Sequence, residues 1–135
     1  MTDLLGEPPS PLDAAIGLVA VELLEDAVVL RLDPPPAALG GEEPRPFLHG
    51  GTLATCVDTA GWYALEHASP GAWITVDLRC DFLRRAEPIS HRVVGRCLVA
   101  GRRIGTADVE ITAWDEPDRL VAVGRARYVR RTDRP

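Results

Sequence analysis

The chain has 135 residues, 46% of them hydrophobic, which is enough for one domain with a sizeable core. Its 20 Asp and Glu residues outnumber its 15 basic residues, all of them arginine, so the formal net charge is −5. Such an acidic chain is not typical of a protein that binds nucleic acid or a membrane surface.

The cysteines and the first residues of the chain indicate its compartment. Cys56, Cys80 and Cys97 are widely spaced, odd in number and form no C-x-x-C motif, which disfavours a disulfide framework and a structural zinc site. The N-terminal segment has no basic stretch ahead of an apolar run, and no apolar run approaches the roughly 20 residues that span a bilayer. We therefore expect a soluble, cytoplasmic protein in a reducing compartment.

The first third of the chain predicts one short helix and two strands. Ser10 followed by Pro11 suits the N-cap and the first position of a helix over residues 11–16. Two β-segments are predicted after it, at residues 17–24 and 27–32. Residues 33–46 hold five prolines and two glycines, so we expect a loop or an extended crossover there.

One long helix is predicted over residues 50–67. Its apolar residues Leu53, Val57, Ala60 and Ala64 follow spacings of four, three and four, so they share one face. Four strands are predicted after this helix, at residues 73–83, 91–99, 105–114 and 120–130. Alternating apolar and polar residues in the last two strands are typical of antiparallel pairing with one solvated face.

About six strands and one long, mostly apolar helix predict an α+β architecture in a single domain over residues 1–135. A helix of this kind has to be covered, so we expect an antiparallel sheet that curls around it. Residues 1–10 are expected to form a loose N-terminal tail.

The start of the long helix carries two glycines, Gly50 and Gly51. The first turn of a helix leaves backbone N–H groups unpaired and carries about half a positive charge. Because glycine lets another molecule approach this backbone closely, the pair suits an oxyanion hole for a carbonyl oxygen. An isolated Gly-Gly pair, however, more often marks only a joint between a loop and a helix.

Asp58 follows Val57 by one residue, which places it at the edge of the apolar stripe. It is either a partly exposed aspartate held by Thr or Arg neighbours or a residue of a functional site.

Gly51 and Asp58 are seven residues apart, about 10 Å along a helix. A base and an oxyanion donor must both lie about 3 Å from one reacting carbonyl. The spacing therefore predicts a dimer in which Gly51 of one subunit faces Asp58 of the other across a two-fold axis.

The segment HGGTLATCVD, residues 49–58, resembles the signature of hotdog-fold acyl-CoA thioesterases of the phenylacetate-degradation (PaaI-like) type. That signature has His-Gly-Gly and an acidic residue nine positions after the His. TVDLRCDFLRRAEP, residues 75–88, is similar to the next strand of the family, and residues 93–130 are similar to its closing three strands. The likeness covers roughly residues 12–131. It implies the hotdog fold, a curled sheet of about six strands wrapped around one central helix.

The resemblance also implies roles for five residues. The N–H of Gly50 or Gly51 would polarise the thioester carbonyl. Asp58, from the partner subunit, would act as general base for water or as direct nucleophile. Thr75 stands where relatives have a Ser or Thr that helps to position the attacking water. His49 would orient the glycine turn, with a capping or core role at least as well supported as proton transfer.

Other positions bear on the substrate. Arg102, Arg103 and Arg85 suit the phosphates of coenzyme A, although charges at turns and edge strands commonly serve to discourage aggregation. Arg85 replaces a proline that is usual in the family, and the bulky Trp62 is expected to shape the acyl pocket. Glu43 stands near the place where relatives often carry a polar Asn.

The sequence therefore predicts an acyl-CoA thioesterase that hydrolyses an aryl- or medium-chain acyl-CoA and works as a homodimer or a dimer of dimers. We expect no metal and no cofactor, because the histidines have no ligand-spaced partners and no nucleotide-binding motif occurs. Two alternatives remain open: an acyl-CoA-binding hotdog protein without activity and, ranked lower, a hotdog hydratase or dehydratase.

Overall fold

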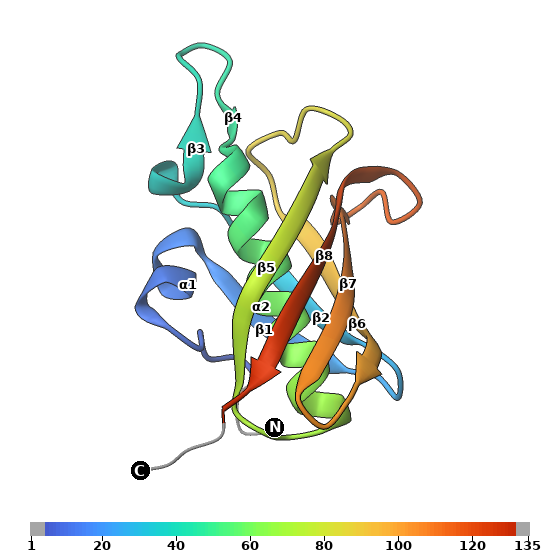
Figure 1. The fold of residues 1–135 in the computed structure, drawn as a ribbon. Helices are drawn as coiled ribbons and strands as arrows, with labels where there is room; N and C mark the ends of the chain where they lie inside the picture. The colour runs from blue at the N-terminus through green and yellow to red at the C-terminus, as the bar shows by residue number, and fades with distance from the viewer. Residues whose placement is uncertain (1–4, 132–135) are drawn as a thin grey trace.

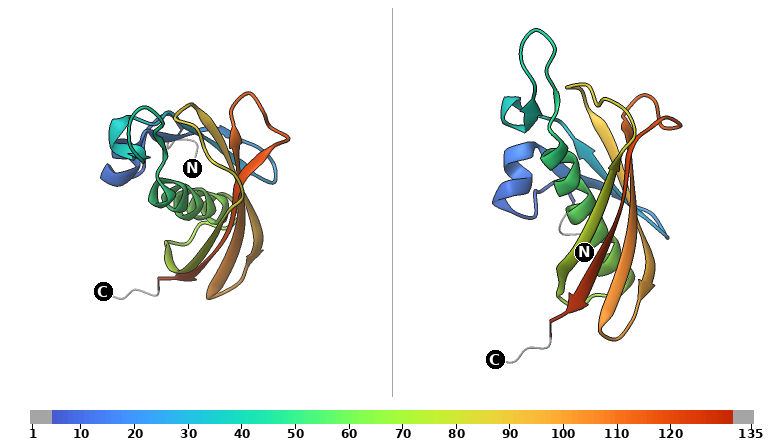
Figure 2. Two further views of the ribbon diagram at one scale, coloured as in Figure 1. Left: turned by 90° about the horizontal axis from the view of Figure 1, so that it is seen from above. Right: turned by 45° about the horizontal axis from the view of Figure 1, so that its top comes forward.

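The computed structural model describes residues 5–131, in which one antiparallel sheet wraps around the long helix α2 (Gly50–Ala68) (Figure 1). The sheet has six strands in the order β1-β2-β6-β7-β8-β5. Their bounds are β1 Leu18–Leu23, β2 Val28–Leu32, β5 Trp73–Phe82, β6 His91–Ala100, β7 Ile104–Ala113 and β8 Leu120–Arg130. Seen from above, the sheet curves around the helix axis (Figure 2). The predicted α+β fold is confirmed.

The segments before α2 contain smaller elements. The predicted first helix is confirmed as α1 (Pro11–Ile16), capped by Ser10. Residues 33–46 form no long element, as expected, but they include a 3-10 turn, η2 (Pro36–Ala38). Two further strands of two residues each, β3 (Leu39–Gly40) and β4 (Phe47–Leu48), pair with each other. Two-residue strands were not predicted, because so short a run shows no hydrophobic period.

Part of the segment expected to be a loose tail contacts the domain. Leu5 forms a parallel bridge with Ala20 of β1, and the N–H of Gly6 donates to the carbonyl oxygen of Ala20 over 2.8 Å. Ser10 belongs to α1 as its cap. The other residues of the expected tail, 1–4, lie outside the described residues.

The core lies between α2 and the concave face of the sheet. The four residues of the predicted apolar stripe are all buried, with exposed fractions of 3% or less. Cys56 and Tyr63 are also fully buried, so the buried face of α2 is wider than the stripe. A curled sheet covers more of the circumference of a helix than a flat sheet does, which explains the difference. Neither α1 nor α2, the α-helices within residues 5–131, is long and apolar enough to cross a bilayer.

At Gly95 of β6 the sheet approaches the helix backbone closely, because a Cβ atom there would overlap the carbonyl oxygen of Ala60 in α2. Backbone cannot move aside as a flexible side chain can, so Gly95→Ala is expected to lower the free energy of unfolding by about 1–3 kcal/mol or more. Urea denaturation measures this change. Gly50→Ala is the matched control, since a Cβ there would lie 3.4 Å from the Phe82 ring, in ordinary contact. Equal stability of the two variants would contradict the packing described here.

Candidate active site

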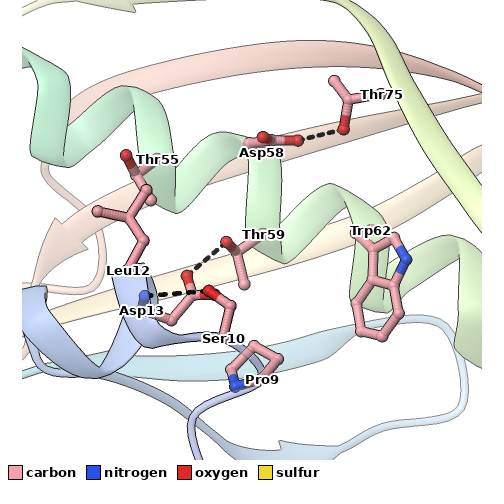
Figure 3. Close-up of a pocket in the computed structure, with 9 residues that line it drawn as sticks. All are labelled: Pro9, Ser10, Leu12, Asp13, Thr55, Asp58, Thr59, Trp62 and Thr75. Carbon is pink, nitrogen blue, oxygen red and sulfur yellow. Dashed lines mark hydrogen bonds between the residues drawn. The ribbon is translucent and has the colours of Figure 1, made fainter.

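One face of α2 is not covered by the sheet and lines a cleft of about 310 Å³ (Figure 3). Its residues occur at helical spacings of three and four, which places them on one side of the helix: Thr55, Asp58, Thr59 and Trp62. Residues from the α1 region form a second wall: Pro9, Ser10, Leu12 and Asp13. Thr75 of β5 lies on the other side of Asp58. The cleft therefore combines two helices and one strand.

Asp58 is half-buried in this cleft, as its place at the edge of the apolar stripe predicted. The hydroxyl of Thr75 donates to Asp58 Oδ1 over 2.6 Å (Figure 3). The backbone carbonyl of Asp58 accepts from the Tyr128 hydroxyl over 2.7 Å. Burial and, to a smaller extent, the nearby Asp58 charge raise the pKa of Tyr128, so the phenol remains a donor. Strands β5 and β8 thus hold the Asp58 side chain and backbone in place.

The N-terminus of α2 distinguishes the two glycines. His49 is the N-cap, and its Nδ1 accepts from the Gly51 N–H over 2.8 Å. The His49 side chain therefore caps the start of α2. The Gly50 N–H has no acceptor within residues 5–131. Of the two glycines, Gly50 therefore offers the free donor.

The free donor and the carboxylate lie in different turns of the helix. Gly50 and Asp58 are eight residues apart in the chain, which corresponds to about 12 Å along the axis of α2. One thioester carbonyl cannot lie within hydrogen-bonding distance of both groups of the same chain.

The chain resembles known proteins in both sequence and fold. The thioesterase superfamily model matches residues 46–122, more than half of the chain. The chain belongs to the thioesterase superfamily. A solved structure from this superfamily is 34% identical, covers 90% of each chain and has a TM-score of 0.82. The E. coli PaaI protein from the phenylacetic acid degradation operon is 23% identical, covers 92% of this chain and 86% of its own, and has a TM-score of 0.75. The hotdog fold inferred from the motifs is confirmed.

A curated protein of Halobacterium salinarum that is named as an esterase is 36% identical to this chain over 92 residues. This match covers 60% of the present chain, which spans 58% of the length of that relative. The expected membership of a thioesterase family is confirmed by the family model over residues 46–122.

In this member of the thioesterase superfamily, the predicted substrate-binding arginines lie apart from the cleft. Arg85 Nη2 donates to the carbonyl oxygens of Arg45 and Pro46 over 2.7 and 2.9 Å, and its Nε donates to Glu87 over 2.9 Å. It therefore ties the segment that leads into His49 to the β5–β6 loop. The predicted pair at residues 102–103 is exposed at the β6–β7 turn, at the opposite end of the molecule from the start of α2 (Figure 1).

Trp62, by contrast, lies within the cleft. It is the residue that the sequence predicted to shape the acyl pocket. It is half-buried one helical turn after Asp58 and packs edge-on against Tyr63, with ring centroids 5.2 Å apart. Among the α2 residues that line the cleft, Trp62 is the last in the chain. Trp62, Asp58 and Thr75 are the three predicted residues that lie together in this cleft.

Sequence reasoning missed Asp13, which is only 4% exposed and faces the cleft. Thr59 donates to Asp13 Oδ1 over 2.6 Å, and Ser10 donates to Oδ2 over 2.5 Å. The spacing Ser10-x-x-Asp13 resembles a capping box, so a closer reading of the first helix could have found this pair. No pattern in the sequence predicts the contact between Asp13 and Thr59, because the two residues are 46 positions apart.

The Asp13 charge also acts on the core behind the cleft. Burial and, second, Asp13 raise the pKa of Cys56 and raise the pKa of Tyr63 to about 12. Cys56 therefore remains a buried thiol in the core and is not a nucleophile. Across residues 5–131, no three His, Cys, Asp or Glu side chains are grouped closely enough to hold a metal ion.

Proposed function

We propose that this protein is an acyl-CoA thioesterase that hydrolyses an aryl- or medium-chain acyl-CoA to the free acid and CoA. The observation that carries the proposal is the half-buried Asp58 carboxylate, held in an open cleft by the Thr75 hydroxyl at 2.6 Å. Its second oxygen, Oδ2, has no hydrogen-bond partner among residues 5–131. A positioned carboxylate with one unengaged oxygen is suited to act on a substrate.

The chemistry needs one proton transfer or one covalent step at Asp58. In the first case Oδ2 accepts a proton from a water molecule whose oxygen attacks the thioester carbonyl; in the second, Oδ2 attacks the carbonyl itself and water resolves the resulting anhydride. In both cases the C–S bond breaks, and the CoA sulfur leaves with the electron pair and takes up a proton. The oxygen of the carbonyl carries the developing negative charge.

The donor for that charge comes from a second copy of the chain. The Gly50 N–H is unpaired at the positive end of α2, which suits stabilisation of an oxyanion. Its distance from Asp58 along α2 is why the two groups must come from different subunits. His49 orients Gly51 and thereby the turn that presents Gly50.

The edge of the sheet supports a dimer. Strand β5 is the last strand in the sheet order, so one of its edges has no partner strand within residues 5–131. It carries exposed apolar side chains, among them Ile74, Val76 and Phe82. An unpaired, apolar edge requires a cover. A second copy along β5 would supply that cover and would form the homodimer, or one half of a dimer of dimers.

Substrate recognition is proposed at both ends of the acyl-CoA. Trp62 supplies an aromatic wall for the acyl group, since it lines the same cleft as Asp58. The guanidinium groups of Arg102 and Arg103 are exposed and suit the CoA phosphates. Arg85 contributes by holding the segment before His49 and keeps one side-chain nitrogen, Nη1, without a partner among residues 5–131.

A panel of acyl-CoA thioesters tests the proposal. Purified protein, without added metal, is expected to release free thiol from at least one aryl- or medium-chain acyl-CoA, measured with a chromogenic thiol reagent. Light scattering on the same sample measures its mass, which is expected to be that of a dimer or tetramer. Binding of several acyl-CoAs without release of thiol from any of them would replace the enzyme with an acyl-CoA-binding protein.

A further inference from the structure

Asp13 is a buried carboxylate that the proposed chemistry does not use. Its side chain lies on the α1 wall of the cleft, beside Thr59, which is the chain neighbour of Asp58 (Figure 3). Asp13 is 4% exposed, so only a small part of the residue remains in contact with solvent, at the cleft. A buried charge of this kind is costly unless hydrogen bonds compensate it.

Capping of α1 explains only part of this arrangement. The bonds between Ser10 and Asp13, one from the Ser10 hydroxyl and one from the Asp13 backbone N–H, form a local cap. The Thr59 bond to Oδ1 is not part of a cap, since it joins α1 to α2. An ionised carboxylate has about four acceptor positions. Side-chain donors occupy two of them, so Asp13 retains acceptor capacity at the wall of the cleft.

We propose that Asp13 is a specificity-determining residue that accepts a hydrogen bond from a hydroxyl group on the acyl chain of the substrate. The inference rests on the proposed function, because it places the acyl group in the Asp58 cleft. An unsubstituted alkyl chain would exclude water from the remaining acceptor positions and leave them unpaired. A hydroxylated chain would replace that water with a charge-assisted hydrogen bond.

This contact lies in the same cleft as Asp58. Asp58 and Thr59 are successive residues of α2, and Thr55 and Trp62 lie one turn to either side. The Asp58 and Thr59 side chains leave the helix in different directions, because successive residues do not face each other, and both line the same cleft. A hydroxyl on an acyl chain that extends along this cleft from Asp58 can reach the Asp13–Thr59 pair, and the position of the preferred hydroxyl reports its distance from the thioester.

The test compares hexanoyl-CoA with its singly hydroxylated analogues. Wild-type protein is expected to hydrolyse the best analogue with a kcat/KM about 10-fold or more above that of hexanoyl-CoA. Asp13→Asn keeps the shape of the side chain but removes its charge and one acceptor oxygen, and is expected to reduce the preference to about threefold or less. Equal kcat/KM for all analogues in the wild type would overturn the inference without any variant.

Ser10→Ala distinguishes the effect of the Asp13 carboxylate from the effect of the helix cap. This variant loses the capping hydroxyl and is expected to melt at a lower temperature, yet it keeps the Asp13 carboxylate and its preference for the hydroxylated chain. Should Ser10→Ala lose the preference as completely as Asp13→Asn, the placement of α1 and not the carboxylate would set it, and the proposal would be wrong.

Binding measurements keep the inference distinct from the proposed function. In the Asp58→Asn background, the Kd for each analogue is measured by calorimetry with Asp13 present and with Asp13→Asn. A Kd preference that depends on Asp13, without hydrolysis by the wild type, would refute the thioesterase and support the recognition role. Hydrolysis of every analogue with no preference in kcat/KM or Kd would support the thioesterase and refute the role of Asp13.

Discussion

Asp58→Asn is expected to lower kcat for the best acyl-CoA substrate by about two to four orders of magnitude. The amide has nearly the shape of the carboxylate, so the bond from Thr75 to the side-chain oxygen can persist. It can neither accept a proton from water at neutral pH nor attack a carbonyl. Steady-state release of free thiol measures the loss, and unchanged melting temperature and mass would show that fold and assembly survive.

A matched control for this variant is Asp108→Asn. Asp108 lies on β7, outside the cleft, and accepts two bonds from Arg125 over 2.6 and 3.0 Å. Its removal alters an exposed ion pair, which contributes little to stability, and kcat is expected to stay unchanged. If Asp58→Asn hydrolysed a good substrate as fast as this control, Asp58 would have no part in the reaction.

Heavy-oxygen water separates the two possible roles of Asp58. If Asp58 is a general base, the attacking water contributes its oxygen to the product acid in the first turnover. If Asp58 is a nucleophile and water attacks the Asp58 carbon of the anhydride, the label enters the enzyme and the first product carries none. Mass spectrometry of the acid and of the Asp58 peptide after a single turnover distinguishes these outcomes.

Gly50→Pro is expected to lower kcat by about two to three orders of magnitude, because proline lacks the N–H that is proposed to stabilise the oxyanion. The backbone can accept proline there, since Gly50 is the first residue of α2, where proline is well tolerated. His49, the residue before it, has φ −60° and ψ 139°, the extended conformation that a following proline favours. Kinetics with the best substrate of the panel measure the effect.

Gly50→Ala is the control for this substitution, because it adds a Cβ at the same place and retains the N–H. Its Cβ would lie 3.4 Å from the Phe82 ring, an ordinary contact. A retained kcat in Gly50→Ala together with a loss in Gly50→Pro assigns the effect to the N–H. Equal losses in both would instead assign it to crowding beside Phe82.

Mixed dimers test whether the site is shared between chains. Asp58→Asn and Gly50→Pro subunits are each expected to be nearly inactive as homodimers. After unfolding and refolding together, half of the dimers are heterodimers with one intact site, so about a quarter of wild-type activity is expected to return. If Asp58 and Gly50 acted within one chain, each mixed dimer would contain only defective sites and no activity would return.

Local patterns determined most of the fold. The apolar period over residues 50–67 predicted α2 to within one residue at its end, since that period depends only on which side chains face the sheet. The later strands were likewise predicted to within one residue at each end, because turns with Gly or Pro bound them. The short strands β3 and β4 were missed, because only their pairing with each other defines them.

The functional motif was partly readable as well. The order His-Gly-Gly, followed by an acidic residue, indicated a helix N-terminus with exposed donors and a carboxylate further along the same helix. It also indicated that the two groups are too far apart for one chain, since the rise of a helix is constant. The motif did not show which of the two glycines, Gly50 or Gly51, has the free backbone N–H. Only the position of the His49 ring, which engages the Gly51 N–H, distinguishes them.

Local sequence patterns therefore predict the elements, the fold class and the spacing of the reactive groups along one helix, because these depend on neighbours in the chain. The packing of the elements, in contrast, selects which distant side chains meet in the cleft. Thr75 meets Asp58 across 17 residues, and Asp13 meets Thr59 across 46. Hydrogen bonds between such positions leave no period or spacing in the sequence, since they depend on how β5 and α1 pack against α2.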